Sequence, residues 1–340
     1  MPFDSRRAFL KAAAGGTGLM SLGAKAEKPT SRGAAGPYRR LSSEVLNLFQ
    51  TVRGTTSLKI WAPATKAGHE LLIDYNASQR LFVGSAIKAF VLCERLRQLD
   101  SPDVVNKISA NQLKLDASVW TVDSKSFNPP NLTGLVSERS AMEAMIMHSD
   151  NTATDMEIAQ AGRQNVQNFL QSAGLANSFI PDSTRVFFGY LFGAPDYKTY
   201  SWEELIASPD DAPIVYPPLN DVETLASSSS DLVSFYSRSL KGEFFQNGQT
   251  LNEFRRILTL ADAIANIPFP LGVTAFAKGG SIDVAGYHAL CLPGAMFFSD
   301  RSVYFSAIIN WNAPELTDPN TTLAFVAVVR QILQLVKDGL

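Results

Sequence analysis

The sequence predicts an α+β fold in which one β-sheet is assembled from both ends of the chain. An all-helical lobe, about residues 100–240, is inserted between the two groups of strands. Two segments near the start and three near the end have the composition of strands, and helical periodicity dominates the region between them. The length of 340 residues and the hydrophobic content of 46% allow a large buried core. We therefore expect one folded unit over residues 41–340.

The sequence of the first part of this unit predicts a helix followed by two strands. Residues Ser43–Val52 have helical spacing of apolar side chains, with Ser42 or Ser43 as the N-cap. Leu58–Trp61 alternates in polarity, and His69–Tyr75 is apolar and ends before an asparagine, so both read as strands.

The sequence of the middle of the chain predicts several helices and one long loop. A helix that starts near Ser85 runs to about Leu99, where Asp100-Ser101-Pro102 stops it. Further helices are expected over three ranges: Ser137–Met147, 155–172 and Ser230–Leu240. Residues 180–231 have no clear periodicity, and a loop of that length in a compact domain is usually functional.

The sequence of the final third of the chain predicts the remaining strands and a C-terminal helix. The expected strands are Gly272–Ala277, Gly286–Leu292 and Val303–Ile309, and the helix covers Thr321–Val336. There is no internal repeat and no low-complexity tract.

Composition and charge exclude several classes of protein. An aromatic content of 10% and a charged content of 18% argue against disorder. The formal net charge is −2 without a block of like charge, so we expect no nucleic-acid partner. The three histidines, His69, His148 and His288, do not have the spacing of metal ligands, and we expect no metal and no cofactor.

The N-terminus has the pattern of a twin-arginine signal peptide. Arg6-Arg7 is followed by Phe-Leu-Lys and a short Gly- and Ala-rich stretch, and Ala24-Lys25-Ala26 has the small residues of a cleavage site. We expect residues 1–26 to be removed before Glu27 after contact with the twin-arginine translocase, with 27–40 as a flexible lead-in. The alternative is an N-terminal amphipathic helix.

Export by this route implies a periplasmic or secreted protein that leaves the cytoplasm already folded. No cysteine lies near the cleavage site and no other stretch is long and apolar enough to span a membrane, so we expect no stable membrane anchor. Cys93 and Cys291 could pair in an oxidising compartment, but both have apolar neighbours, which is typical of buried free cysteines.

A Ser-x-x-Lys pair at the start of the helix near residue 85 is the first candidate for chemistry. Residues three apart share a helix face, so the Ser85 hydroxyl and the Lys88 amine can approach each other. A serine needs a base to become a nucleophile, and a desolvated lysine can be that base. The pair alone is a weak signal, since an ordinary polar helix start has the same residues.

Two further motifs follow in the chain at the ends of predicted elements. Ser149-Asp150-Asn151 follows a helix of the middle lobe, and Lys278-Gly279-Gly280-Ser281 follows the first C-terminal strand. Each alone is an ordinary turn sequence. All three in this order, each where a cleft could form, strongly favour a catalytic site.

The set resembles the signature of class A β-lactamases and penicillin-binding proteins: Ser-x-x-Lys, Ser-Asp-Asn and Lys-[Thr/Ser]-Gly. The resemblance covers about residues 40–338 and is weakest over 180–226. It implies a β-lactamase/transpeptidase-like three-layer α/β/α sandwich with an antiparallel five-stranded sheet.

The resemblance also implies roles for the matched residues. Ser85 is the expected nucleophile and Lys88 the base, with a pKa lowered by burial and by the nearby Lys278 cation. Ser149 is expected to relay a proton to the leaving nitrogen. Three residues are expected to bind substrate, with the backbone N–H groups of Ser85 and Ser281 forming an oxyanion hole: Asn151, Lys278 and Ser281. Asp150 is as well explained by tying the lobe together as by a direct role.

The chain departs from the family pattern on the long loop. Class A enzymes have a hydrolytic glutamate in Glu-x-x-Leu-Asn, whereas this chain has Tyr216-Pro217-Pro218-Leu219-Asn220. A tyrosine with an ordinary pKa is a poor general base at neutral pH. We therefore expect acylation with slow deacylation unless another carboxylate substitutes, and five are candidates: Asp155, Glu203, Glu204, Asp221 and Glu223.

A second departure is Gly279, which stands where the family has a hydroxyl residue that helps to hold the substrate carboxylate. Ser281 is a candidate to compensate for it.

Three functions remain open at this stage. The leading one is an exported β-lactamase-type serine hydrolase, which opens a β-lactam ring and acts in β-lactam catabolism or antibiotic resistance. The alternatives are a penicillin-binding-protein-like acyl-enzyme former (a D,D-peptidase or esterase) and a non-catalytic binder of cell-wall peptides. The expected partner is a small β-lactam or a cell-wall peptide, and we expect a monomer.

Overall fold

The computed structural model describes residues 31–32, 36–66, 68–208, 212–262, 264 and 269–340. The signal peptide predicted for residues 1–26, its cleavage before Glu27 and much of the lead-in over 27–40 lie outside the described residues.

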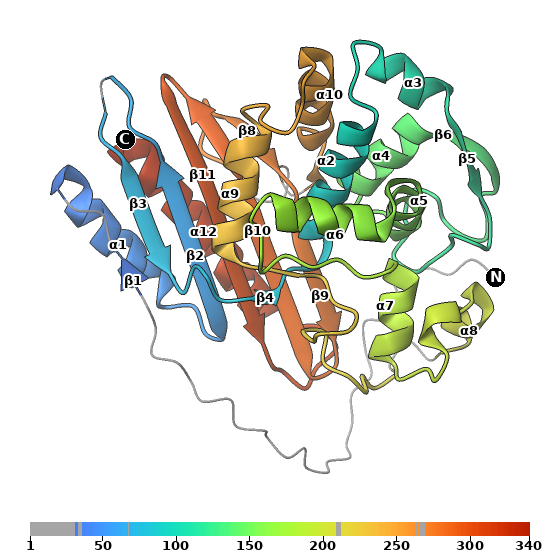
Figure 1. The fold of residues 1–340 in the computed structure, drawn as a ribbon. Helices are drawn as coiled ribbons and strands as arrows, with labels where there is room; N and C mark the ends of the chain where they lie inside the picture. The colour runs from blue at the N-terminus through green and yellow to red at the C-terminus, as the bar shows by residue number, and fades with distance from the viewer. Residues whose placement is uncertain (1–30, 33–35, 67, 209–211, 263, 265–268) are drawn as a thin grey trace.

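The fold has three layers with the sheet in the middle (Figure 1). Helices α1 (Arg39–Phe49) and α12 (Pro319–Gly339) pack on one face of the sheet, around a core that includes Phe49, Ile60 and Phe325. The helical lobe packs on the other face around a larger core that includes Phe90 and Tyr304. This arrangement confirms the predicted α+β sandwich.

The sheet is antiparallel and joins both ends of the chain. The strand order is β1 (Ser31–Arg32), β3 (Leu71–Tyr75), β2 (Thr55–Ala62), β11 (Arg301–Trp311) and β10 (Tyr287–Phe298), followed by β8 (Thr274–Ala277) and β9 (Gly280–Val284), which both pair with β10. The five predicted strands are present as β2, β3, β8, β10 and β11. Among the described residues the sheet has seven strands rather than the five predicted, because β1 and β9 are additional; the prediction of a flexible lead-in missed β1, and that of a turn after the first C-terminal strand missed β9.

β8 and β9 occupy one edge of the sheet and are separated by Lys278 and Gly279. β8 pairs with β10 up to Gly294, and β9 pairs with it from Cys291. Pro293, which has no N–H to donate to a ladder, lies at this break. Because of this interruption, Lys278 and Gly279 are not part of the regular pairing with β10.

The N-terminal helix begins earlier than predicted. α1 starts at Arg39 and ends at Phe49, so Ser42 and Ser43 lie inside it and neither is the N-cap. The Ser43 hydroxyl donates to the Arg39 carbonyl one turn earlier. The tertiary contact with α12, in which Gly339 lies against Leu41, favours the longer helix.

The lobe is mostly helical and also contains a short ribbon that was not predicted. Its helices are α2 (Lys88–Gln98), α3 (Val104–Ala110), α4 (Glu138–Met147), α5 (Asn151–Ala161), α6 (Arg163–Ser172), α7 (Thr184–Leu191), α8 (Trp202–Ala207), α9 (Ser229–Ser239) and α10 (Gly248–Leu258). The ribbon pairs β5 (Gln112–Leu115) with β6 (Gly134–Ser137).

One predicted helix of the lobe is in fact two. The segment 155–172 is divided between α5 and α6 at Gly162, whose φ of +79° ends the first helix and turns the chain. α5 also starts four residues earlier than predicted, because Asp150 caps it by accepting from the Ala153 N–H.

The region 180–226 contains helices where the sequence indicated none. Ser183 caps α7, and Ser201 with Glu204 forms a capping box for α8. Aromatic residues pack between these helices and the rest of the lobe, with Tyr200 and Trp202 buried against Trp120. The long loop is therefore an ordered element with its own small core.

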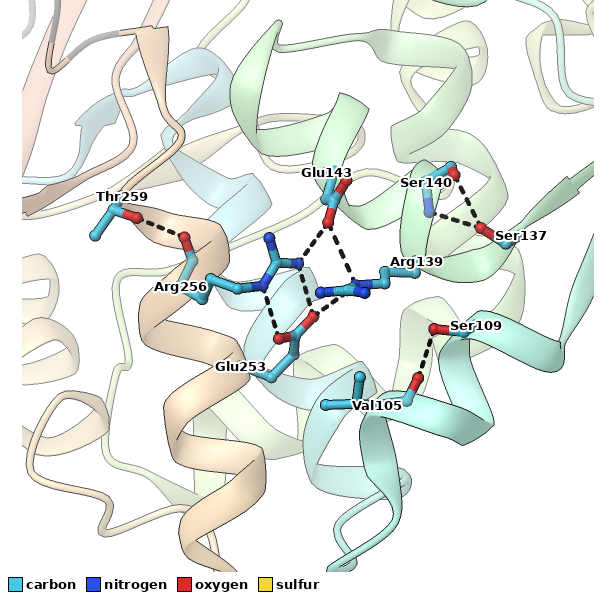
Figure 2. Close-up of polar contacts among 9 residues, drawn as sticks. All are labelled: Val105, Ser109, Ser137, Arg139, Ser140, Glu143, Glu253, Arg256 and Thr259. Carbon is cyan, nitrogen blue, oxygen red and sulfur yellow. Dashed lines mark hydrogen bonds and ion pairs between the residues drawn. The ribbon is translucent and has the colours of Figure 1, made fainter.

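Charged residues connect α4 to α10 across the lobe surface (Figure 2). The Arg256 guanidinium contacts Glu253 at 2.7 Å and Glu143 at 2.5 Å, and the Arg139 guanidinium contacts the same two carboxylates at 3.2 Å and 3.4 Å. Glu253 is almost completely buried, so its charge depends on these two arginines.

Cys93 and Cys291 are both buried and free, as their apolar neighbours indicated. Among the helices of the described residues, none combines the length and the apolar composition needed to cross a membrane.

Candidate active site

The Ser-x-x-Lys pair lies in a tight turn at the entry to α2. The short strand β4 (Leu81–Phe82) pairs with β7 (Ala226–Ser227) and is followed in the chain by a 3-10 turn, η2 (Gly84–Ile87). Helix α2 begins directly after this turn, at Lys88. Asn310 of β11 fixes the chain segment that precedes this turn. Its side-chain amide accepts a hydrogen bond from the Phe82 N–H and donates one to the Phe82 carbonyl oxygen, both at 2.9 Å. Ser85 is partly exposed, while Lys88 behind it is completely buried.

Two glycines allow β9 to lie directly against the turn that carries Ser85. A Cβ added to Gly280 would lie 2.1 Å from the Val83 carbonyl oxygen and 2.6 Å from the Ser85 nitrogen. A Cβ added to Gly84, whose φ is +52°, would lie 2.7 Å from the Ser281 carbonyl oxygen. The backbones of Ser85 and Ser281 are thereby brought together, as the expected oxyanion hole requires.

The Lys88 amine has three partners on the turn between α4 and α5. Nζ donates to the Ser149 carbonyl oxygen at 2.6 Å and to Asn151 Oδ1 at 2.7 Å, and it lies 3.3 Å from Ser149 Oγ. Within the described part of the chain, no hydrogen bond joins Lys88 to Ser85. The structure therefore brings Lys88 together with Ser149 and Asn151 as well as placing it one turn from Ser85.

Burial lowers the pKa of Lys88 well below its ordinary value. The Lys278 cation lowers it further, while Asp150, Asp155 and Asp123 oppose the shift. A neutral amine has two N–H donors and one lone pair. The two short contacts can use both donors, and the lone pair is then available to a hydroxyl such as Ser149 Oγ. The site can therefore hold Lys88 as a base at neutral pH.

Lys278 is the second buried cation of the site. Its Nζ donates to the Gly279 carbonyl oxygen at 2.9 Å, and burial lowers its pKa to about 8, against an opposing effect of Asp262. It is protonated at neutral pH and remains available to an anionic group of a ligand. Sequence reasoning anticipated this proximity of the two lysines.

The Ser149 backbone has a left-handed conformation, with φ of +56°. This conformation is uncommon for residues other than glycine and is found where surrounding structure enforces it. Asp150 provides that support, because its carboxylate accepts from the backbone N–H groups of Ser126, Phe127 and Ala153 at 2.9–3.0 Å. The structure thus favours the lobe-tying role that we considered for Asp150.

A segment that the sequence did not single out completes this side of the site. The Val122 carbonyl oxygen accepts from Asn151 Nδ2 at 3.1 Å, and Ser124 Oγ accepts from the Thr152 N–H at 2.8 Å. The Asn151 amide oxygen and one of its two N–H donors are therefore engaged within the protein, and the second N–H is left for its predicted role as a donor to substrate. No motif marks residues 121–127 in the sequence.

The loop residues do not join the cluster around Lys88. The Tyr216 ring stacks on Tyr190, with centroids 4.7 Å apart, and its backbone N–H donates to the Leu191 carbonyl. Tyr216 is 45% exposed. The Asn220 side chain is used within its own loop, where it donates to the Glu223 carbonyl oxygen at 2.7 Å and accepts from two backbone N–H groups.

Four of the five candidate carboxylates have a structural partner. Asp155 accepts from the backbone N–H groups of Thr184 and Arg185, and burial raises its pKa to about 6 despite these bonds. The others contact different parts of the loop: Glu223 pairs with Lys198, Asp221 with Arg80, Glu204 closes the capping box, and Glu203 is exposed on α8.

None of the five contacts Ser85, Lys88 or Ser149 in the region that the structure describes. In the same region, no group of three or more His, Cys, Asp or Glu side chains could hold a metal ion.

Comparison with known protein families gives one match. A family model described as the Beta-lactamase enzyme family matches residues 40–250. Among curated protein sequences, nothing matches this chain.

Solved structures show the same fold at low sequence identity. PBP-A is 17% identical, with a TM-score of 0.63 and coverage of 88% of this chain and 96% of that chain. A class A beta-lactamase from Mycobacterium abscessus is 15% identical, with a TM-score of 0.63 and coverage of 87% and 99%. A representative class A beta-lactamase from Bacteroides cellulosilyticus is 14% identical, with a TM-score of 0.67 and coverage of 90% and 100%.

Proposed function

This chain belongs to the beta-lactamase enzyme family, and we propose that it is an exported serine hydrolase that opens a β-lactam ring through an acyl-enzyme on Ser85. The observation that carries the proposal is the environment of Lys88. This lysine is completely buried behind the Ser85 turn, its pKa is lowered, and Ser149 and Asn151 hold its amine. A lysine in that state is a base next to a hydroxyl nucleophile.

In the proposed first half-reaction, neutral Lys88 accepts the proton of Ser85 Oγ, directly or through Ser149 Oγ, and Ser85 attacks the ring carbonyl. The backbone N–H groups of Ser85 and Ser281 stabilise the oxyanion. The C–N bond then breaks, and the leaving nitrogen receives its proton through Ser149. The Lys278 cation holds the substrate carboxylate, and the exposed Ser281 hydroxyl can assist it where Gly279 has none.

In the proposed second half-reaction, water releases the acyl group slowly. Tyr216 replaces the family's hydrolytic glutamate and stacks on Tyr190 instead. Four of the candidate carboxylates have structural partners, Asp155 among them at the start of α7, and Glu203 is exposed on α8. Release therefore proceeds without a dedicated general base, which costs about 10²–10⁴-fold in rate.

The same observation favours a second candidate, a penicillin-binding-protein-like acyl-enzyme former such as a D,D-peptidase or esterase. Such an enzyme needs the acylation groups and has no need for rapid hydrolysis of a β-lactam. A non-catalytic binder of cell-wall peptides is disfavoured, because Ser85, Lys88, Ser149 and Lys278 are all retained.

Export through the twin-arginine pathway is part of the proposal and rests on residues 1–26. Mass spectrometry of the mature protein should find Glu27 as the first residue, and an intact Met1 would contradict export. A role in antibiotic resistance follows only if turnover is measurable.

The deciding experiment is a time course of intact-protein mass spectra with benzylpenicillin. We expect an adduct that forms on Ser85, decays slowly but measurably within the time course, and is absent from the Ser85→Ala variant. A transient adduct with nitrocefin turnover identifies a β-lactamase, and a persistent adduct identifies the second candidate. Absence of both labelling and turnover would reject β-lactam chemistry.

A further inference from the structure

A cavity outside the cluster of catalytic groups lies at one end of the central sheet. Its volume is about 640 Å³, and none of Ser85, Lys88, Ser149 and Lys278 lines it. The start of β2, the end of β11 and the first turn of α12 form one side, and the segment before β4 forms the other. This volume is within the range of sites for small molecules.

One wall of the cavity is aromatic and held rigidly. The Trp311 indole N–H donates to Asp318 at 3.1 Å, and its ring stacks on His288 at 5.1 Å. The Tyr287 hydroxyl donates to Asn310 at 2.8 Å. Leu81 and Leu219 also line the cavity. These side chains offer a ligand a preformed apolar surface.

The charged groups of the cavity favour an anion. The Asp318 carboxylate is already used, since it accepts from Trp311, from the Thr321 N–H and from the Thr321 hydroxyl. Arg80 pairs with Asp221 outside the cavity at 2.5 Å. Arg53 is exposed and has no ion pair or hydrogen bond to any residue that the structure describes. Its positive charge is therefore available to a ligand.

Two amide side chains add uncommitted hydrogen-bonding groups to this end of the cavity. Gln79 and Asn312 both line it, and neither side-chain amide has a partner among the described residues. A guanidinium group with amides beside it suits a planar oxyanion such as a carboxylate, or a phosphate.

We propose that this cavity is a binding site for a small organic anion, with the oxyanion on Arg53 and an apolar ring against Trp311. The site is separate from the catalytic groups but is connected to them. Asn310 lines the cavity and also holds both backbone groups of Phe82, three residues before Ser85. Leu219 places the end of the long loop at the same cavity. A bound anion therefore lies next to both the segment that precedes Ser85, on which attack depends, and the end of the long loop, on which release depends.

Calorimetric titration of the mature protein with benzoate and with phenyl phosphate, at constant ionic strength, tests the site. We expect saturable binding of both probes and weaker binding of inorganic phosphate, which has no ring. Arg53→Gln should raise the dissociation constant about ten-fold, because it removes a charge-assisted pair. Gln79→Ala should raise it by a smaller factor.

The matched control is Arg40→Gln, which removes the same charge from an exposed position on α1 that does not line the cavity. Both arginines are exposed, so neither variant should disturb folding, and circular dichroism checks this. Equal loss of affinity in the two variants would show a general charge effect and overturn the site. Absence of saturable binding by the parent protein would overturn it as well.

A pH series separates this cavity from the catalytic site, which also contains cations. Benzoate remains ionised and arginine remains charged from pH 6 to 9, so binding at Arg53 should not change. Lys278 loses its proton near pH 8, so binding there would weaken over the same range. Loss of benzoate affinity above pH 8, or its loss in Ser85→Ala, would assign the probe to the catalytic site and reject the proposal.

Discussion

The two sides of the proposed catalytic site differ in how their polar groups are used. Around Lys88, one buried amine donates short hydrogen bonds to Ser149 and Asn151, and Asp150 supports the turn that provides these acceptors. On the loop over 180–226, the polar groups point to one another or to the loop backbone: Tyr216 stacks on Tyr190, and Asn220 closes its own turn.

This difference indicates that the proposed site is preorganised for attack by Ser85 rather than for hydrolytic release of the acyl group. Preorganised groups lower a barrier because they need no rearrangement at the moment of reaction. The groups around Lys88 have that property, and the loop carboxylates do not: Glu204, Asp221 and Glu223 would have to break a structural contact, and Glu203 is exposed on α8. Four predictions test this contrast, from the largest expected effect to the smallest.

Removal of the Lys88 amine should affect acylation most. Lys88→Met keeps the length of the buried side chain without its base, and we expect acylation by benzylpenicillin to slow by about 10³-fold. Stopped-flow measurement of acylation provides the rate. Lys114→Met is the control, since Lys114 is exposed on β5 and contacts Asp116. A rate for Lys88→Met within ten-fold of the parent would place the base elsewhere.

A carboxylate restored to the loop should accelerate release. We expect Tyr216→Glu to raise the deacylation rate by about 10²-fold, because it returns a general base to the position where related enzymes have one. Decay of the acyl-enzyme followed by mass spectrometry measures this rate. Tyr216→Gln, which has the same shape and no base, should not accelerate release. Equal rates in the two variants would show that the loop cannot deliver a base to the acyl group.

The acylation rate should depend on pH in a bell shape. Lys88 must be neutral, so the rate rises as pH increases through its lowered pKa. Lys278 must be protonated, so the rate falls above its pKa of about 8, to about a tenth at one pH unit higher. Lys278→Arg, which remains charged, should remove the alkaline fall. An unchanged alkaline limb in that variant would exclude Lys278 as its source.

The charged cluster between α4 and α10 should matter least. Arg139→Gln breaks two partly exposed ion pairs but leaves Arg256 on Glu253, so we expect a loss of about 1 kcal/mol or less in the free energy of unfolding. Urea denaturation measures this loss, and the acylation rate should not change. A lower acylation rate would mean that the attack side depends on the lobe surface, which would weaken the contrast.

The sequence predicted those parts of the fold that local patterns determine. Strand alternation and apolar spacing located β2, β3, β8, β11 and α12 to within a few residues, whereas β10 continues to Phe298, beyond its predicted end at Leu292. The division of α5 from α6 depends on a single glycine, Gly162, that the helical period does not reveal. α7 and α8 had a readable signal, since Ser201-Trp202-Glu203-Glu204 is a capping box, but the Pro- and Asp-rich surroundings hid it.

At the site, the three motifs supplied the residue types, and their contacts came from tertiary structure. The approach of Lys88 to Lys278 follows from the motif order. The bond from Lys88 to the Ser149 carbonyl does not, because it requires the left-handed backbone at Ser149. The hydrogen bonds from the first backbone N–H groups of α7 to Asp155 likewise join residues about thirty positions apart, which no local pattern encodes.

The position of β11 has a consequence for how the chain is made. This strand lies between β2 and β10, so the N-terminal strands pair only with one another, and one edge of β2 stays unpaired, until Arg301–Trp311 has been synthesised. Such non-local pairing makes folding slow and leaves strand edges exposed during translation. The nascent chain should therefore remain sensitive to protease almost until release from the ribosome. A proposed export route that carries folded proteins would give this chain the time to complete its sheet before it leaves the cytoplasm.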